Sequence, residues 1–463
     1  MNRYQRLLGN TAIFAIGTFS SKILVFIMMR YYTAVLNSEQ FGISDTITQT
    51  ANVMIPFATV CITSAIIRFG LEKTNNKKEV FTIGVATVAV AYAVLLLFEP
   101  LLAKVKYLDE YTVLIYAYVL TSSLQQLSHQ FVRARGHVRL YAIDGVFRTV
   151  MTIVCNVLYL SAFKMGIIGY VLGTMTADVI STICLFLIDE QYKFLDFRHL
   201  NRTLAGQMLK YSVLLIPAQV CNWIISMSDR YFLNYMHDAA DTGLYSVANR
   251  IPTILILISS IFIEAWQIST INDSPRREQE RFFTRVGNVY QALVFLMVSG
   301  IILFAKLAVF LLAAPSYYTA WRIIPFLVIG SGFACLSNFM NSIYTLEKKS
   351  NWSMLTVLCG ACTNLALNAL MIPKMGPNGA ALATMISYIL MFLIRAVHTR
   401  QYIRVRWHVG RFAVSAVLLI AQGLLLLAEG PLWIPIQVFL FLLIALLNLR
   451  DILIGVRKVL HRA

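Results

Sequence analysis

Apolar stretches of about 20 residues recur along nearly the whole chain, with short polar segments between them. A hydrocarbon layer roughly 30 Å thick requires helices of this length. The stretches do not alternate between apolar and polar residues as barrel strands do. The pattern predicts an all-α integral membrane protein with about fourteen transmembrane helices. The expected spans are residues 10–34, 42–68, 80–103, 111–133, 141–162, 166–188, 209–235, 243–268, 286–312, 320–345, 353–372, 377–397, 409–428 and 431–449.

Composition supports this reading. Hydrophobic residues make up 58% of the 463 positions and charged residues only 13%, whereas a soluble domain carries roughly 25% charged residues. The net charge of +17 comes from basic residues in loops between apolar spans, with no soluble domain to hold nucleic acid. Most of these residues fall on the side of the N-terminus, so we expect both termini in the cytoplasm.

An internal repeat groups the expected helices. The segment Lys164-Met165-Gly166-x-x-Gly169-x-x-Leu172-x-Thr174-Met175 recurs 210 positions later as Lys374-Met375-Gly376-x-x-Gly379-x-x-Leu382-x-Thr384-Met385. Each half contains an even number of spans, which predicts two parallel six-helix repeats about a pseudo-two-fold axis along the membrane normal. The expected parts are an N-terminal lobe (1–188), a cytoplasmic linker (189–208), a C-terminal lobe (209–397) and a C-terminal helix pair with its tail (398–463).

Basic residues occur inside several spans, where a charge costs about 2.5–3.5 kcal/mol unless it faces a cavity or a partner. Lys22 lies near the middle of the first span, and Arg148 and Arg250 lie about two turns into the fifth and eighth. Arg30 and Arg230 lie near the outer ends of the first and seventh spans. These five side chains are candidates for lining a cavity, and the simpler alternative is that their long stems reach the lipid headgroups.

Four acidic residues also fall within or beside the spans, namely Asp45, Asp178, Asp229 and Glu264. Each is a candidate for coupling to Na⁺ or H⁺, and the simpler alternative for each is a structural ion pair. Pro56, Pro217 and Pro252 interrupt the second, seventh and eighth spans and predict bends there.

Signals of an enzyme are absent from the sequence. It contains no Gly-rich nucleotide loop of the Lys-Ser/Thr type and no zinc-type His pair. These absences disfavour a nucleotide-driven pump, and we expect no catalytic residues, metal or resident cofactor.

Two motifs resemble a known family. Asp229-Arg230-Tyr231-Phe232-Leu233 followed by Thr242-Gly243-Leu244-Tyr245-Ser246-Val247-Ala248, and Ser20-Ser21-Lys22 followed by Glu39-Gln40-Phe41-Gly42, are similar to bacterial polysaccharide flippases of the multidrug/oligosaccharidyl-lipid/polysaccharide exporter superfamily. The resemblance implies transport of undecaprenyl-diphosphate-linked oligosaccharides across the bacterial cytoplasmic membrane, for capsule, O-antigen or another glycan. It also implies membrane lipids, a polysaccharide polymerase and glycosyltransferases as partners.

The expected mechanism places Lys22, Arg148 and Arg250, together with Arg30 and Arg230, around the substrate diphosphate. Two alternatives within the superfamily are a lipid II flippase and a cation-coupled multidrug or metabolite exporter. A third alternative is a polymerase or ligase acting on lipid-linked sugars, but such enzymes usually carry a large outer loop, which the predicted topology lacks.

Overall fold

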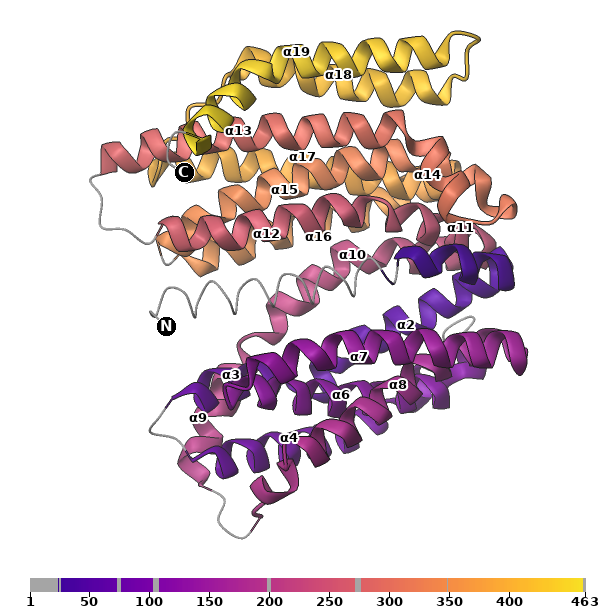
Figure 1. The fold of residues 1–463 in the computed structure, drawn as a ribbon, viewed down its shortest axis with the longest axis vertical. Helices are drawn as coiled ribbons and strands as arrows, with labels where there is room; N and C mark the ends of the chain where they lie inside the picture. The colour runs from indigo at the N-terminus through magenta and orange to yellow at the C-terminus, as the bar shows by residue number, and fades with distance from the viewer. Residues whose placement is uncertain are drawn as a thin grey trace. The chain divides into compact units, whose positions relative to one another are not determined.

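The structure is a computed structural model in which all described elements are helical (Figure 1). Nine of the described helices are long and apolar enough to cross a membrane, or ten if the bent pair α2–α3 is counted as one span. Contacts divide the chain into unit 1, residues 1–223, and unit 2, residues 224–463, with the boundary inside helix α10. The described residues are 24, 26–72, 76–102, 108–197, 201–270, 276–347 and 349–460.

Unit 1 is built around α6, which packs against α2, α3, α4, α7 and α8. Asparagine caps begin three of its helices: Asn37 with Gln40 forms a capping box on α2, and Asn76 and Asn201 cap α4 and α9. The elements are α2 Ser38–Ala58, α3 Ile62–Leu71, α4 Lys77–Leu96, α5 Glu99–Leu102, η1 Asp109–Tyr111, α6 Thr112–Ala134, α7 Val138–Val157, the π-helical turn η2 Leu158–Ala162, α8 Gly166–Ile188, η3 Gln191–Phe194 and α9 Arg202–Val213.

The span expected at 42–68 is broken into α2 and α3, which meet at 52°. The break follows Pro56, which has no N–H to donate; its carbonyl accepts from the Cys61 amide at 3.1 Å. Val60 and Cys61 at the break have φ of +50° and +53°. Pro217 and Pro252 were also expected to interrupt their spans. Each follows a helix break, at residues 214–215 and at Ile251, and lies in the first turn of the next helix, where the missing N–H costs nothing.

Unit 2 is built around α15, 89% of whose apolar window is buried. This helix packs against α17, α12 and α13. The elements are α10 Ile216–Met236, α11 Ala239–Arg250, α12 Pro252–Thr270, α13 Arg276–Leu303, α14 Ala305–Leu312, η4 Pro315–Arg322, α15 Ile324–Leu346, α16 Ser350–Met375, α17 Pro377–His398, η5 Thr399–Gln401, α18 Val409–Leu427 and α19 Trp433–Leu460.

Several expected spans differ from these bounds, among them the following three. The span at 209–235 includes a break at residues 214–215, between α9 and α10. Helix α13 begins at Arg276, ten residues before the span expected at 286–312, and the last helix continues to Leu460, beyond the span expected at 431–449. Hydropathy detects only the part of a helix that lies in hydrocarbon, so polar helical extensions were missed.

The C-terminal pair α18 and α19 packs on α13 (Figure 1). Buried amides join them, since Ser299 donates to Gln422 at 2.7 Å and Gln291 donates to Asn448 at 3.3 Å. At the α18–α19 turn, Lys306 donates to Glu429 at 2.7 Å and thereby lowers the pKa of this carboxyl. The Lys306 ammonium lies 4.3 Å from the ring centres of both Trp321 and Trp433, a favourable cation–π geometry.

The repeated sequence segment adopts similar local geometry in both units. Gly166 and Gly376 have φ of +53° and +54°, a region that favours glycine. The glycine three residues later contacts the preceding helix in each unit: a Cβ on Gly169 would lie 3.3 Å from the Tyr159 carbonyl oxygen, and one on Gly379 would lie 2.5 Å from that of Met371. Both segments thus bring two helices into close backbone contact.

Replacing Gly379 with alanine is expected to destabilise the protein by about 1–3 kcal/mol, because the added Cβ would meet backbone atoms that move only if α16 and α17 separate. Thermal unfolding in detergent measures this effect. Gly410→Ala is the matched control, since a Cβ at this position in α18 meets nothing within 4 Å. Equal melting temperatures for the two variants would contradict the close approach.

Candidate functional site

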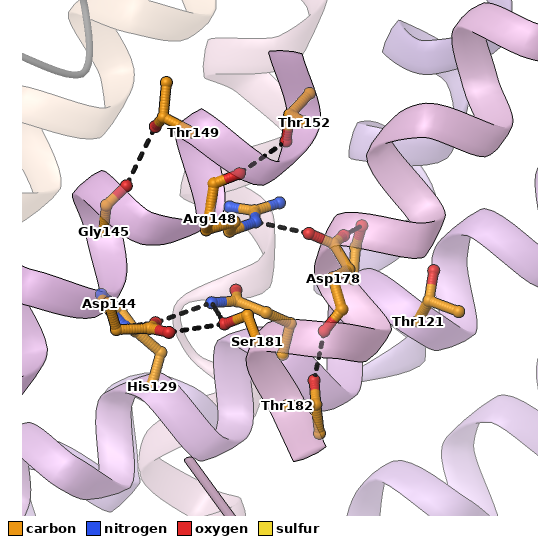
Figure 2. A network of polar contacts seen from close by, with 12 residues as sticks. Thr121, His129, Asp144, Gly145, Arg148, Thr149, Thr152, Asp178, Ser181 and Thr182 are labelled. Carbon is orange, nitrogen blue, oxygen red and sulfur yellow. Dashed lines mark hydrogen bonds and ion pairs between the residues drawn. The ribbon is translucent and has the colours of Figure 1, made fainter. Parts of the chain in front are cut away.

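A polar network crosses the interior of unit 1 and joins α6, α7 and α8 (Figure 2). Asp178 on α8 is fully buried. It accepts hydrogen bonds from Ser122 on α6 and from the Nε of Arg148 on α7. The structure therefore pairs Arg148 and Asp178, two residues that the sequence suggested for separate roles.

The ion pair uses only one side of the Arg148 guanidinium. Its Nη atoms have no hydrogen-bond partner in the described parts of the chain, and the side chain is 32% exposed. Arg148 also lines a cavity of about 220 Å³, together with Tyr32, Gln125, His129, Gly145, Thr149, Thr152 and Ile153. A buried charge pair is costly to break when one partner is lost, so Asp178 holds a cation at this cavity.

A second carboxylate lies one turn before Arg148 on α7. Asp144 is 3% exposed and accepts from Ser181 at 2.7 Å and from Gln125 at 3.3 Å. The Nδ1 of His129 is 2.7 Å from the same carboxylate. Positions four apart share a helix face, so α7 presents Asp144 and Arg148 together to the core of unit 1.

Unit 2 contains a buried carboxylate of a different kind. Asp229 on α10 is 1% exposed and accepts from Tyr245, from Asn368 at 2.6 Å and from Thr384 at 2.8 Å. Asn364 donates to it at 3.4 Å. All four donors are neutral. The carbonyl oxygen of the Asn368 side chain is buried and has no hydrogen-bond partner in the part of unit 2 that the structure describes.

The other expected site residues are placed as follows. Arg230 is buried, with its guanidinium 5.8 Å from the Tyr245 ring centre. Arg250 is the last residue of α11, and Arg30 is exposed in the helical segment 26–35.

Asp45 is buried in α2 and accepts from Gln49 at 3.4 Å. Lys22 lies outside the described residues, as does the side chain of Glu264, whose backbone is part of α12.

The five expected cations are divided between the units. Arg30 and Arg148 belong to unit 1 and Arg230 and Arg250 to unit 2, while Lys22 is not described. A single cavity formed by all five therefore stays a prediction. The lobe boundaries expected at residues 188 and 209 also stay predictions, because units 1 and 2 are defined by contacts and not by the sequence repeat.

Sequence reasoning missed several members of both networks. His129, Gln125 and Asp144 in unit 1, and Asn364 and Asn368 in unit 2, were not singled out. Their spacing was an available signal, because Gln125 and His129 on α6 and the two asparagines on α16 are four residues apart, which places each pair on one helix face. Polar pairs at this spacing inside an apolar span indicate a buried network.

Unit 1 also contains an apolar cavity of about 1100 Å³ along α4, and Arg202 is its one charged lining residue. None of the expected site residues lines it. The polar cavity at Arg148 is the smaller of the two, but it is lined by the hydrogen-bonding side chains of Arg148, His129 and Gln125.

Comparisons with known proteins agree with a membrane transporter fold. A solved lipid II flippase, MurJ, in an inward closed conformation, has a TM-score of 0.72 and 16% identity, covering 97% of this chain and 100% of that one. An inward-facing multidrug resistance MATE transporter of the MOP superfamily has a TM-score of 0.69 and 12% identity, covering 85% of this chain and 95% of the other. The Vibrio cholerae MATE transporter VcmN has a TM-score of 0.57 and 16% identity, covering 86% and 96%.

Identities this low establish the shared fold alone. No significant match is found among curated proteins. The family model described as polysaccharide biosynthesis protein matches residues 7–267, which is more than half of the chain. This multi-pass helical protein, with the fold of flippases and transporters, therefore belongs to the polysaccharide biosynthesis protein family.

Proposed function

We propose that this protein is a flippase that moves undecaprenyl-diphosphate-linked oligosaccharides from the cytoplasmic to the outer leaflet by alternating access. The observation that carries the proposal is the placement of Arg148. Its Nε is held by the buried Asp178, and its terminal nitrogens are available to a polar cavity. Membership of a polysaccharide biosynthesis family supports this substrate class.

In this mechanism the cations bind the diphosphate, and charge-assisted hydrogen bonds offset the desolvation of both partners. Lys22, Arg30, Arg230 and Arg250 are the further members of the proposed cationic path. The polyprenyl tail is as apolar as lipid and stays in the bilayer. Two negative charges that move outward across an inside-negative potential gain roughly 2.3 kcal/mol per charge per 100 mV, so transport needs no nucleotide hydrolysis.

The proposed topology has about fourteen spans, both termini in the cytoplasm and two parallel six-helix lobes, followed by a helix pair. The similar glycine geometry at Gly166 and Gly376 supports the repeat. So does the helix packing, because α6 contacts α8 and α2 in unit 1 as α15 contacts α17 and α12 in unit 2. A bacterial cytoplasmic membrane, with a polymerase and glycosyltransferases as partners, follows from the proposed substrate.

Ion coupling is proposed at Asp229, ahead of Asp45, Asp178 and Glu264. The charge of Asp178 is matched by Arg148, whereas the hydrogen bonds to Asp229 from the described residues all come from neutral donors. The carboxylate, the Asn368 carbonyl and the Thr384 hydroxyl offer oxygen ligands, which hard cations such as Na⁺ prefer. A proton on Asp229 is the alternative occupant.

The test is reconstitution in liposomes with a fluorescent polyprenyl-diphosphate oligosaccharide, whose exposure on the outer leaflet is read with an impermeant quencher. We expect exposure that depends on the protein and increases with an inside-negative potential. Empty liposomes give the background. Absence of exposure with wild-type protein would refute the proposal.

The same liposomes distinguish the alternatives. Movement of lipid II in preference to the oligosaccharide lipid would identify a lipid II flippase, the activity named for the matched MurJ structure. Export of cationic drugs in exchange for Na⁺ or H⁺, without lipid movement, would identify a multidrug exporter such as the matched MATE transporters. Chain extension of the oligosaccharide would identify a polymerase.

A further inference from the structure

His129 brings a second nitrogen to the cavity that Arg148 lines. The ring stacks on Tyr141, with 3.9 Å between ring centres, and its Nδ1 is 2.7 Å from Asp144. Its Nε2 has no hydrogen-bond partner in the described part of unit 1. The ring is thus anchored at one nitrogen, as the Arg148 guanidinium is anchored at Nε (Figure 2).

The surroundings of Asp144 determine which ring nitrogen carries a proton. An ionised carboxylate only accepts hydrogen bonds, and Asp144 accepts from Ser181 and Gln125 as well. His129 therefore donates through Nδ1–H. In the neutral ring Nε2 is an acceptor, and in the protonated ring it becomes a second donor.

The two threonine hydroxyls that line the cavity add no donors, because Thr149 donates to the Gly145 carbonyl at 2.9 Å and Thr152 donates to the Arg148 carbonyl at 2.9 Å. The terminal nitrogens of Arg148 and the Nε2 of a protonated His129 are therefore donors that this cavity offers to an anion. Its volume of about 220 Å³ is below the roughly 300–1,000 Å³ of drug-sized ligand pockets. It has room for a phosphate group but not for an oligosaccharide.

We propose that this cavity is the phosphate-binding subsite of the flippase, with Arg148 as its permanent cation and His129 as a second cation that is protonated when the phosphate binds. The inference rests on the proposed function and names the residue that makes substrate binding depend on pH. An anion in the cavity stabilises the protonated His129 ring. By linkage, protonation of the ring strengthens anion binding by the same free energy.

The other charged and titratable groups around His129 lie on α6 itself and on the helices packed against it. On α7 they are Asp144 and Arg148, with Tyr141 against the ring, and Arg133 on α6 lies 5.7 Å from the Tyr141 ring centre. Tyr32 lines the cavity, and Asp178 on α8 pairs with Arg148. The remaining helices packed against α6 carry Glu39 and Asp45 in α2, Arg68 in α3, and Lys77, Lys78 and Glu79 in the first turn of α4. Asp45 accepts from Gln49, and Arg68 lies over Tyr211.

The experiment is calorimetric titration of the purified full-length protein with a water-soluble farnesyl-diphosphate sugar. The diphosphate in this probe is a diester, so its charge stays constant between about pH 6 and pH 8, where histidine titrates. We expect the Kd of the probe to be about tenfold lower at pH 6 than at pH 8. The reason is that the cavity has a second cation only at the pH at which the histidine is charged. Titrations in buffers of different ionisation enthalpy should show the uptake of up to one proton per bound ligand near pH 7.

Three variants separate the role of His129 from a structural one. His129→Gln keeps an amide donor, so binding should persist while its pH dependence and proton uptake are lost. His129→Lys should bind at pH 8 as tightly as wild type binds at pH 6. His137→Gln is the matched control, because His137 pairs with Asp189 at 2.6 Å and does not line the cavity; its binding should match that of wild type.

Wild-type protein that binds the diester without proton uptake would overturn the inference, whatever the variants do. Wild-type pH dependence in a folded His129→Gln protein would also overturn it. Neither result bears on the proposed function, which the liposome assay tests separately. If the protein takes up a proton with the diester but moves no lipid in liposomes, the subsite stands and the flippase proposal fails.

Discussion

Replacement of Arg148 with alanine is expected to reduce translocation of the oligosaccharide lipid by about 100-fold or more, because a hydrogen bond to a charged group is worth about 1.5–3 kcal/mol and Arg148 offers more than one. The same change leaves Asp178 buried without its cation, which costs about 3–5 kcal/mol of stability. The liposome assay measures the first effect, and thermal unfolding measures the second.

The two effects separate in the double variant Arg148→Ala/Asp178→Asn. Removing both charges should restore much of the stability and none of the translocation. Arg139→Ala is the matched control, because Arg139 is an exposed arginine on the same helix. If translocation returns together with stability in the double variant, Arg148 has a structural role only.

Replacement of Asp229 with asparagine is expected to abolish the stabilisation of the protein by Na⁺. A bound ligand raises the free energy of unfolding by RT ln(1 + [L]/Kd), so the melting temperature of wild type should rise with Na⁺ and that of the variant should not. The variant should also lose stability without Na⁺, by about 1–3 kcal/mol, because an amide cannot satisfy all the donors that face Asp229.

Asp238→Asn is the matched control for Asp229→Asn. Asp238 caps α11 by accepting from the Asp241 amide at 2.7 Å, and asparagine caps helices about equally well. The control should therefore keep the Na⁺ response. Melting temperatures of wild type that rise with falling pH and ignore Na⁺ would identify a proton as the occupant, and insensitivity to both would refute ion coupling at Asp229.

The helical class and most helix positions were predictable because hydrocarbon imposes a length and an apolar composition on each span. The break between α2 and α3 was signalled by Pro56, but its location at residues 59–61 was not. Pro217 and Pro252 mark breaks in their spans as expected, but each lies in the first turn of the helix after the break, because proline begins a helix more readily than it continues one.

The candidate sites were predictable only in part. Arg148, Asp178 and Asp229 were identified individually, because a charge in an apolar span stands out. Their partners were missed, since serine, threonine, asparagine and glutamine are unremarkable in sequence. The neutral donors to Asp229 of α10 come from α11, α16 and α17, and hydropathy carries no information on which helix faces meet.

The sequence alone determined that this is a multi-spanning helical membrane protein with charged positions inside its spans. Span length and charge cost act locally along the chain, so both are readable from it. Only the tertiary structure decided that Asp178 neutralises Arg148, that Asp144 orients His129, and that Asp229 lies among neutral donors. These pairings depend on helix packing, which sets distances of a few ångströms between residues that are far apart in the chain.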